Sequence, residues 1–204
     1  MRALILVDLQ IDFCPGGALE VTEGDRVIPI ANQLMDRFDL VVATQDWHPA
    51  DHKSFAANHL WRKIGQVIDV NGLPQVLWPI HCVQESFGAE FHPGLKLDAI
   101  DEIFQKGTDP EIDSYSGFFD NGHRKATGLG EYLKSKDVDE VFILGLATDY
   151  CVKFTALDAV ELGFQTTLIE DATRGVNLRD NDVSNAVEEM RTAGVTVVQS
   201  ADLK

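Results

Sequence analysis

The stretch V-F-I-L-G-L-A-T-D-Y-C-V at residues 141–152 decides how we expect the chain to fold. Its apolar run ends at Gly145 and a helical pattern opens at Val152, which predicts a buried strand, a tight turn and a helix start. Cys151 would then lie at a helix N-terminus, where free backbone N–H groups and the helix dipole lower a thiol pKa and stabilise an oxyanion. A lone cysteine is more often a small buried side chain. Its position here favours a reactive thiol.

The composition narrows the class of partner. A net charge of −16, from 17 basic and 33 acidic residues, disfavours nucleic acid and membranes as partners, because phosphate binding needs a basic footprint. The apolar run at residues 3–7 is too short for a signal peptide, and no stretch approaches the roughly 20 apolar residues of a membrane helix. Three cysteines cannot all pair within the chain, so we expect reduced thiols and a cytoplasmic protein.

Apolar runs alternate with helical periodicities along the chain. Such alternation predicts an α/β fold, with a mostly parallel central sheet between two helical layers in a three-layer α/β/α arrangement. With no repeat or linker, residues 1–204 are expected to form one domain, and the irregular residues 46–82 a functional loop insertion. The expected strands are 3–7, 40–43, 102–105, 140–146, 165–170 and 195–198, and the expected helices 25–38, 129–136, 151–162 and 181–193.

Four polar or reactive residues follow expected strands: Asp8, Asp46, Lys106 and Cys151. Sites in such folds gather outside the carboxyl ends of parallel strands, so these side chains are expected at one edge of the sheet. By default Asp8 would be a turn residue and Lys106 a solvated surface cation. Beside a thiol, Asp8 would instead act as general base, and Lys106 would favour the anionic forms of both groups.

A D-x-H-x-x-x-H pattern lies in the irregular loop, formed by Asp46, His48 and His52. Carboxylate and imidazole donors suit a divalent Zn, Fe or Mn ion, and His81 at the end of the same loop could complete the set. Unrelated surface histidines are the alternative. His59 is a weaker candidate, and His92 and His123 are expected on the surface.

A phosphotransferase that uses the strand-end aspartate is one alternative function. That chemistry prefers a second carboxylate two residues after Asp8, where this chain has Gln10, and neither G-x-x-x-x-G-K-[ST] nor G-x-G-x-x-G occurs. An inactive binding or metal-storage module is another alternative. It would be expected to have lost one of Asp8, Lys106 or Cys151, and all three are present.

Six motifs, in a fixed order along nearly the whole chain, together resemble the sequence of a known family. The sequence resembles the nicotinamidase group of the isochorismatase-like cysteine hydrolases. The motifs are A-L-I-L-V-D-L-Q-I-D-F at 3–13, A-T-Q-D-W-H-P-A-D-H at 43–52, W-P-I-H-C at 78–82, F-Q-K-G at 104–107, Y-S-G-F at 115–118 and G-L-A-T-D-Y-C-V at 145–152. Any one of them alone would be weak, and together they are specific.

The resemblance implies a role for each candidate residue. It makes Asp8, Lys106 and Cys151 a catalytic triad, and Asp46, His48, His52 and His81 the metal ligands. It places Phe13, Trp78 and Tyr115 in an aromatic substrate pocket. It also implies a cis peptide before Ala147, which aims the backbone N–H groups of Ala147 and Cys151 at an oxyanion. Some relatives carry histidine before the nucleophile where this chain has Tyr150, which alters a pocket wall.

The implied activity is deamidation of nicotinamide to nicotinate and ammonia through a cysteine thioester, as in NAD salvage. The implied cofactor is one divalent ion, with Zn first and Fe or Mn as alternatives. A cysteine amidase acting on another small amide remains the nearest rival, and the metal pattern favours nicotinamide. Self-association and the use of pyrazinamide-like analogues are left open.

Overall fold

A six-stranded sheet in the order β5-β2-β1-β6-β7-β8 forms the centre of the protein, and every neighbouring pair in it is parallel. The structure is a computed structural model that describes residues 1–203. The strands are β1 (Arg2–Val7), β2 (Leu40–Asp46), β5 (Glu102–Lys106), β6 (Glu140–Leu146), β7 (Gln165–Arg174) and β8 (Thr196–Val198). The parallel sheet predicted from the alternating pattern is confirmed.

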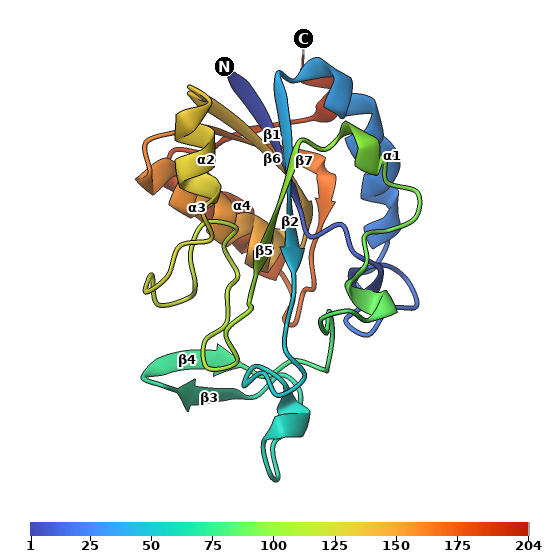
Figure 1. Cartoon of the computed structure of the whole chain (residues 1–204), viewed down its shortest axis with the longest axis vertical. Coiled ribbons are helices and arrows are strands. Elements are labelled where there is room, and N and C mark those ends of the chain that lie inside the picture. Colours follow the sequence, from blue (N-terminus) through green and yellow to red (C-terminus); the bar gives the residue numbers. More distant parts are fainter. Residues whose placement is uncertain (204) are drawn as a thin grey trace.

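Helices cover both faces of this sheet (Figure 1). One face packs against α1 (Val27–Leu34), and the other against α2 (Leu129–Ser135), α3 (Lys153–Glu161) and α4 (Asp182–Thr192). The three-layer α/β/α arrangement is therefore confirmed. Short 3-10 turns lie at Ile11–Phe13, Gly24–Arg26, Met35–Arg37, Ala56–Asn58, Phe87–Ala89, Leu97–Ala99 and Ser200–Asp202. No helix within residues 1–203 combines the length and the apolar character that a membrane crossing requires.

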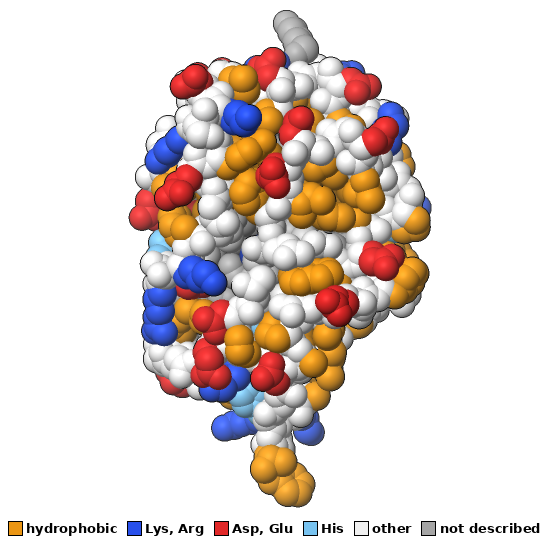
Figure 2. Space-filling view, in the orientation of Figure 1, with side chains coloured by type: hydrophobic (Ala, Val, Ile, Leu, Met, Phe, Trp, Pro, Cys, Tyr) orange, Lys and Arg blue, Asp and Glu red, His pale blue; other side chains and the backbone are white. Residues whose placement is uncertain are grey.

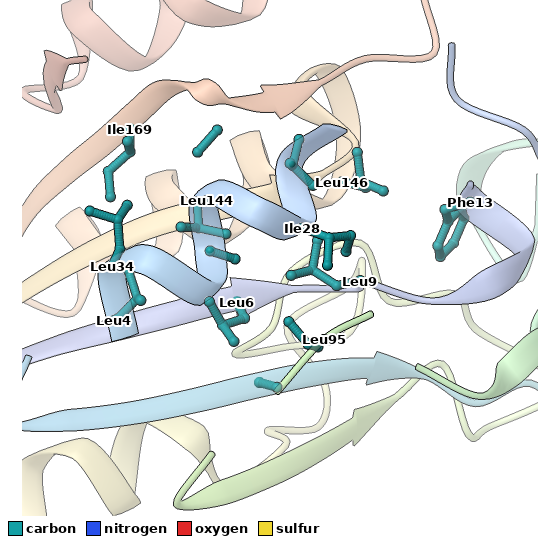
Figure 3. Packing of buried hydrophobic residues seen from close by; sticks show 14 of the residues in the cluster. Leu4, Leu6, Leu9, Phe13, Ile28, Leu34, Leu95, Leu144, Leu146 and Ile169 are labelled. Carbon is teal, nitrogen blue, oxygen red and sulfur yellow. The ribbon is translucent and has the colours of Figure 1, made fainter. Parts of the chain in front are cut away.

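Strand β1 shows how the apolar runs build two cores. Its side chains alternate, so that Leu4 and Leu6 pack in the cluster with α1, while Ile5 and Val7 pack in the cluster with α2, α3 and α4. Figure 3 shows the first cluster, in which Leu4 and Leu6 lie with residues of α1, β6 and β7. Each fully buried leucine stabilises the fold by roughly 2 kcal/mol. Burial on both faces explains why the strand sequence is an unbroken apolar run.

The long loop after β2 contains a β-hairpin that the sequence analysis missed. Strands β3 (Val67–Val70) and β4 (Leu73–Val76) pair antiparallel, so residues 46–82, expected to be the least regular part of the chain, contain one regular element. Asn71 and Gly72 join them with φ of 53° and 83°, the left-handed conformation that this dipeptide favours in hairpins. The loop forms the lower end of the molecule in Figure 1, and Figure 2 shows a hydrophobic projection there. Leu60 and Trp61 of this loop are 87% and 96% exposed.

The turn after β6 differs from the expected helix start at Cys151. A π-helical turn at Thr148–Val152 precedes α3, and the carbonyl of Ala147 accepts hydrogen bonds from the N–H groups of Tyr150 (3.0 Å) and Val152 (3.1 Å). Cys151 therefore lies inside this wide turn, two residues before the regular helix. The peptide bond between Leu146 and Ala147 is cis, as the resemblance implied.

We predict that Gly145→Ala lowers the free energy of unfolding by roughly 2–4 kcal/mol, measured by urea denaturation. A Cβ at this position would lie 2.1 Å from the carbonyl oxygen of Val7 in β1, and the residue has a φ of 124°. The matched control is Gly194→Ala, at a φ of 103° with no atom within 4 Å of the added Cβ. In the control, the free energy of unfolding should fall by only about 1 kcal/mol, because alanine disfavours the positive φ at this position. Equal losses in the two variants would contradict the contact argument.

Candidate active site

The sheet order brings the four strand-end residues together. Asp8 follows β1, Asp46 and Lys106 end β2 and β5, and Cys151 lies in the turn after β6. These four strands are neighbours in the order β5-β2-β1-β6, and Asp46 and Lys106 lie directly opposite each other in the β2–β5 register. All four side chains are buried. The grouping expected from the sequence is therefore observed.

The Lys106 ammonium lies at the centre of this group. Its Nζ is 2.9 Å from Asp8 Oδ2, donates a hydrogen bond of 2.6 Å to Asp46 Oδ1, and lies 3.4 Å from Cys151 Sγ. It also donates to the carbonyl of Ser114 at 2.9 Å. A buried cation needs such partners, because an isolated buried charge costs several kcal/mol. Lys106 thus joins the thiol to both carboxylates.

The electrostatics of the group follow from burial and from this cation. Burial raises the pKa of the Cys151 thiol well above its ordinary value, and the charge of Lys106 opposes the rise. Burial also raises the pKa of Asp8, again opposed by Lys106. Burial alone would lower the pKa of Lys106. The carboxylates of Asp46 and Asp8 outweigh this effect and raise the pKa of Lys106 well above its usual range. Lys106 is therefore a permanent cation beside two groups that can exchange one proton.

Next to Lys106 lies a cluster of metal-ligating side chains. Asp46, His48 and His81 are buried, and each offers one ligand atom within 4.8 Å of the other two. Asp46 Oδ2 is 3.1 Å from His48 Nε2 and 3.5 Å from His81 Nε2. Both spacings are close to the ligand–ligand edge of a tetrahedral Zn²⁺ site, about 3.4 Å for metal–ligand bonds near 2.1 Å. One carboxylate and two imidazoles are also a donor set that suits this ion.

His52 lies beside this cluster and fits it chemically. Its ligand atom groups with those of His48 and Asp113 rather than with Asp46 and His81. Its Nδ1 is 2.7 Å from the Ser54 hydroxyl, and its buried Nε2 has no hydrogen-bond partner among the described residues. Burial lowers the pKa of His52 to about 4, so the ring is neutral at pH 7. A neutral, unpartnered imidazole nitrogen is the form that binds a metal.

Aromatic side chains enclose the space in front of Cys151. Phe13, Trp78 and Tyr115, expected there from the resemblance, line one pocket with the thiol, and so does Tyr150. Trp78 Nε1 donates to the Tyr115 hydroxyl at 3.2 Å, and the rings of Trp78 and Tyr150 meet edge to face at 4.8 Å. The pocket also contains His81 of the metal cluster. A flat aromatic ring fits such walls.

Comparison with known proteins places the chain in a family. The model of the isochorismatase domain matches residues 2–202. The chain belongs to the isochorismatase family. The resemblance found in the six motifs is thereby confirmed at the level of the family.

Relatives of this isochorismatase-family chain include named nicotinamidases. It is 52% identical over 207 residues to the nicotinamidase of Escherichia coli K12, covering 98% of this chain and 96% of that protein. A solved nicotinamidase/pyrazinamidase from Acinetobacter baumanii superimposes with a TM-score of 0.97 at 47% identity, covering 100% and 98% of the two chains. The pyrazinamidase of Pyrococcus horikoshii, solved in complex with zinc, has a TM-score of 0.78 at 42% identity, with 97% and 98% covered.

Asp149 is a structural residue of the site that the sequence analysis passed over. Its buried carboxylate accepts backbone N–H bonds from Val176 (2.9 Å) and Asn177 (2.8 Å). Val176 lines the same pocket as Cys151, so Asp149 ties a pocket wall to the turn that carries the thiol. The approach is close, because a Cβ on Gly175 would lie 2.9 Å from Asp149 Oδ1.

Thr44 and Asp113 are further side chains that the sequence analysis missed. Thr44 lies two residues before Asp46 on β2, and its hydroxyl donates to Asp8 Oδ1 at 2.6 Å. The period-2 alternation of a strand could have placed Thr44 on the same face as Asp46. Asp113 has no such signal, since it lies in an irregular segment and is held by Gln75 of β4 at 2.9 Å.

Proposed function

We propose that this protein is a metal-containing cysteine amidohydrolase that converts nicotinamide to nicotinate and ammonia, as in NAD salvage. The observation that carries the proposal is the buried Lys106 ammonium, which contacts Asp8 and also Cys151 Sγ and Asp46, two residues that line the aromatic pocket. A relative named as a nicotinamidase, 52% identical over nearly the full length, supports the choice of substrate.

In the proposed reaction Asp8 takes the proton of the Cys151 thiol. A buried thiol resists ionisation, so the thiolate forms beside the fixed positive charge of Lys106 while the proton moves to Asp8. The thiolate attacks the carboxamide carbon, and the backbone N–H groups of Ala147 and Cys151 stabilise the oxyanion. Asp8 then gives its proton to the leaving nitrogen as the C–N bond breaks. Ammonia departs, and the acyl group remains on Cys151 as a thioester.

Water completes the cycle. Asp8, now ionised, removes a proton from the water that attacks the thioester carbon. The C–S bond breaks, nicotinate is released, and the thiol regains its proton from Asp8. The same carboxyl group thus serves as base and acid in both halves, which suits a buried carboxyl whose pKa is raised.

The pocket explains why a flat heteroaromatic amide is proposed as the substrate. Phe13, Trp78 and Tyr115 would hold the ring, with Tyr150 as an additional wall. Asp46, His48 and His81 would hold a divalent ion, with His52 as the fourth protein ligand. When bound, the ion supplies a Lewis-acid contact that orients the ring nitrogen. His81 lines the same pocket as Cys151, which supports a metal ion next to the ring of the substrate.

We predict that Cys151→Ala lowers kcat for nicotinamide deamidation by at least roughly 10³-fold, measured as ammonia release. The fold should survive, because the change removes one sulfur atom. Cys14→Ala, which removes another buried thiol, is the matched control and should retain activity. Aliphatic amides and ureido compounds assayed in parallel should be poor substrates of the unmodified protein. Substantial ammonia release by Cys151→Ala would exclude the nucleophile, and preference for a non-aromatic amide would exclude the proposed substrate.

We predict that Thr44→Val shifts the acidic limb of the kcat/KM profile to higher pH and leaves the basic limb in place. The Thr44 hydroxyl bonds Asp8 and lowers its pKa, and valine keeps the shape without the hydroxyl. The Asp8 pKa should therefore rise, and activity should be lost earlier as the pH falls. Thr155→Val, at another buried threonine, on α3, is the control. If the acidic limb of the kcat/KM profile does not move in Thr44→Val, that limb does not reflect the ionisation of Asp8.

We predict that His81→Ala and His52→Ala each lower the metal content of the purified protein, measured by elemental analysis. The His81 substitution should cause the larger loss of metal, because His81 belongs to the same ligand group as Asp46. The His52 substitution tests whether the unpartnered Nε2 of His52 binds the ion. His92→Ala, outside both groups, is the control and should keep full occupancy. Stoichiometric metal in His52→Ala would remove that residue from the ligand set, and the same result in His81→Ala would place the ion elsewhere.

A further inference from the structure

A second cluster of metal-ligating side chains lies on α3, away from the cluster around Asp46. His123, Asp158 and Glu161 each offer one ligand atom within 4.8 Å of the others. Asp158 and Glu161 are three residues apart in α3 and therefore share one face of the helix. His123 comes from the loop before α2, and its Nε2 is 3.2 Å from Asp158 Oδ1.

Asp158 has an unsatisfied carboxylate oxygen that points to a missing partner. The side chain is only 8% exposed, and among the described residues its Oδ2 has no hydrogen-bond partner. A buried polar atom without a partner costs about 1–3 kcal/mol. Within residues 1–203, no lysine or arginine forms an ion pair with Asp158 or Glu161.

The loop presents His123 to α3 in a fixed geometry. Its N–H donates to the carbonyl of Asp120 at 2.9 Å, while Asp120 Oδ1 accepts the N–H groups of Gly122 and Arg124, each at 2.9 Å. The His123 ring stacks on Phe119 at a centroid distance of 4.8 Å and 23°. The Arg124 guanidinium donates to the Asn71 carbonyl (3.0 Å) and does not pair with the carboxylates of α3. The imidazole is therefore held beside Asp158 with no competing cation on it.

We propose that His123, Asp158 and Glu161 form a second metal site, which binds Zn²⁺ with water completing a four-coordinate shell. One imidazole and two carboxylates are donors that zinc accepts. The Nε2–Oδ1 distance of 3.2 Å is close to the ligand–ligand edge of a zinc tetrahedron, about 3.3 Å for bonds near 2.0–2.1 Å. Asp158 and His123 also line a cavity of about 240 Å³, which gives the ion and its water room.

The site would link α3 to the wall of the substrate pocket. Tyr115 lines both the 240 Å³ cavity and the pocket of Cys151, and its ring stacks on Phe154 of α3 at 5.5 Å. An ion that ties His123 to α3 would therefore stiffen the segment that carries Tyr115. The role is structural support for the pocket, because none of the three ligands reaches Cys151.

Zinc titration of the protein with its other bound metal in place tests the proposal. A chromophoric chelator competes for Zn²⁺, and the unmodified protein should bind one equivalent more than either His123→Ala or Glu161→Gln. Both substituted side chains are on the surface, so the variants should fold. Glu131→Gln, an exposed position on α2, is the matched control and should bind as the unmodified protein does.

Two further readouts separate a built site from weak surface binding. Co²⁺ in place of Zn²⁺ should give the visible absorption of a four-coordinate ion, and His123→Ala should abolish this band. Added Zn²⁺ should raise the melting temperature of the unmodified protein and of Glu131→Gln, with no rise in the two ligand variants. The proposal is overturned if the unmodified protein binds no more zinc than His123→Ala and Glu161→Gln, or if those variants keep the cobalt band.

Discussion

The buried Lys106 ammonium is the interaction on which the site depends. A lone ammonium in the interior would cost several kcal/mol, and here it is surrounded by two carboxylates, the Ser114 carbonyl and the Cys151 sulfur. Lys106 and these groups come from the ends of β1, β2 and β5, from the irregular segment at Ser114 and from the turn after β6. Only the order β5-β2-β1-β6 brings them to one point, so the sheet topology is a requirement of the charge network. Removing either carboxylate would leave the cation under-compensated.

Asp46 links this network to the metal cluster. Its Oδ1 faces Lys106, while its Oδ2 faces His48 and His81. Burial alone would raise the pKa of Asp46. Lys106 and His48 outweigh this effect and hold the pKa of Asp46 well below its usual range. Asp46 therefore stays ionised, whereas Asp8, whose pKa burial raises, can take up a proton. Two aspartates in one buried group thus have different states, set by which cations each one faces, and the proposed mechanism uses that difference.

The sequence could predict the parts of this structure that depend on local pattern. Ala3–Val7 and the run before Gly145 are apolar because both faces of their strands are covered, and that pattern is visible without coordinates. The positions of Asp8 and Cys151 followed from where those runs stop. The hairpin β3–β4 carried a readable signal, Asn71-Gly72 between two short runs, which the sequence analysis overlooked. Its strands are partly exposed and contain Pro74, so the hydrophobic alternation is weak there.

The contacts between segments distant in the chain could not be predicted in this way. The carboxylate of Asp149 accepts hydrogen bonds from the backbone N–H groups of Val176 and Asn177, which lie far along the chain. Nothing in the local sequence distinguishes Asp149 from a turn aspartate. The wide turn that holds Cys151 likewise depends on the Ala147 carbonyl, which accepts two N–H groups. Together these bonds fix the thiol and the Val176 wall to the same backbone segment. The pocket wall and the nucleophile should therefore move as one unit.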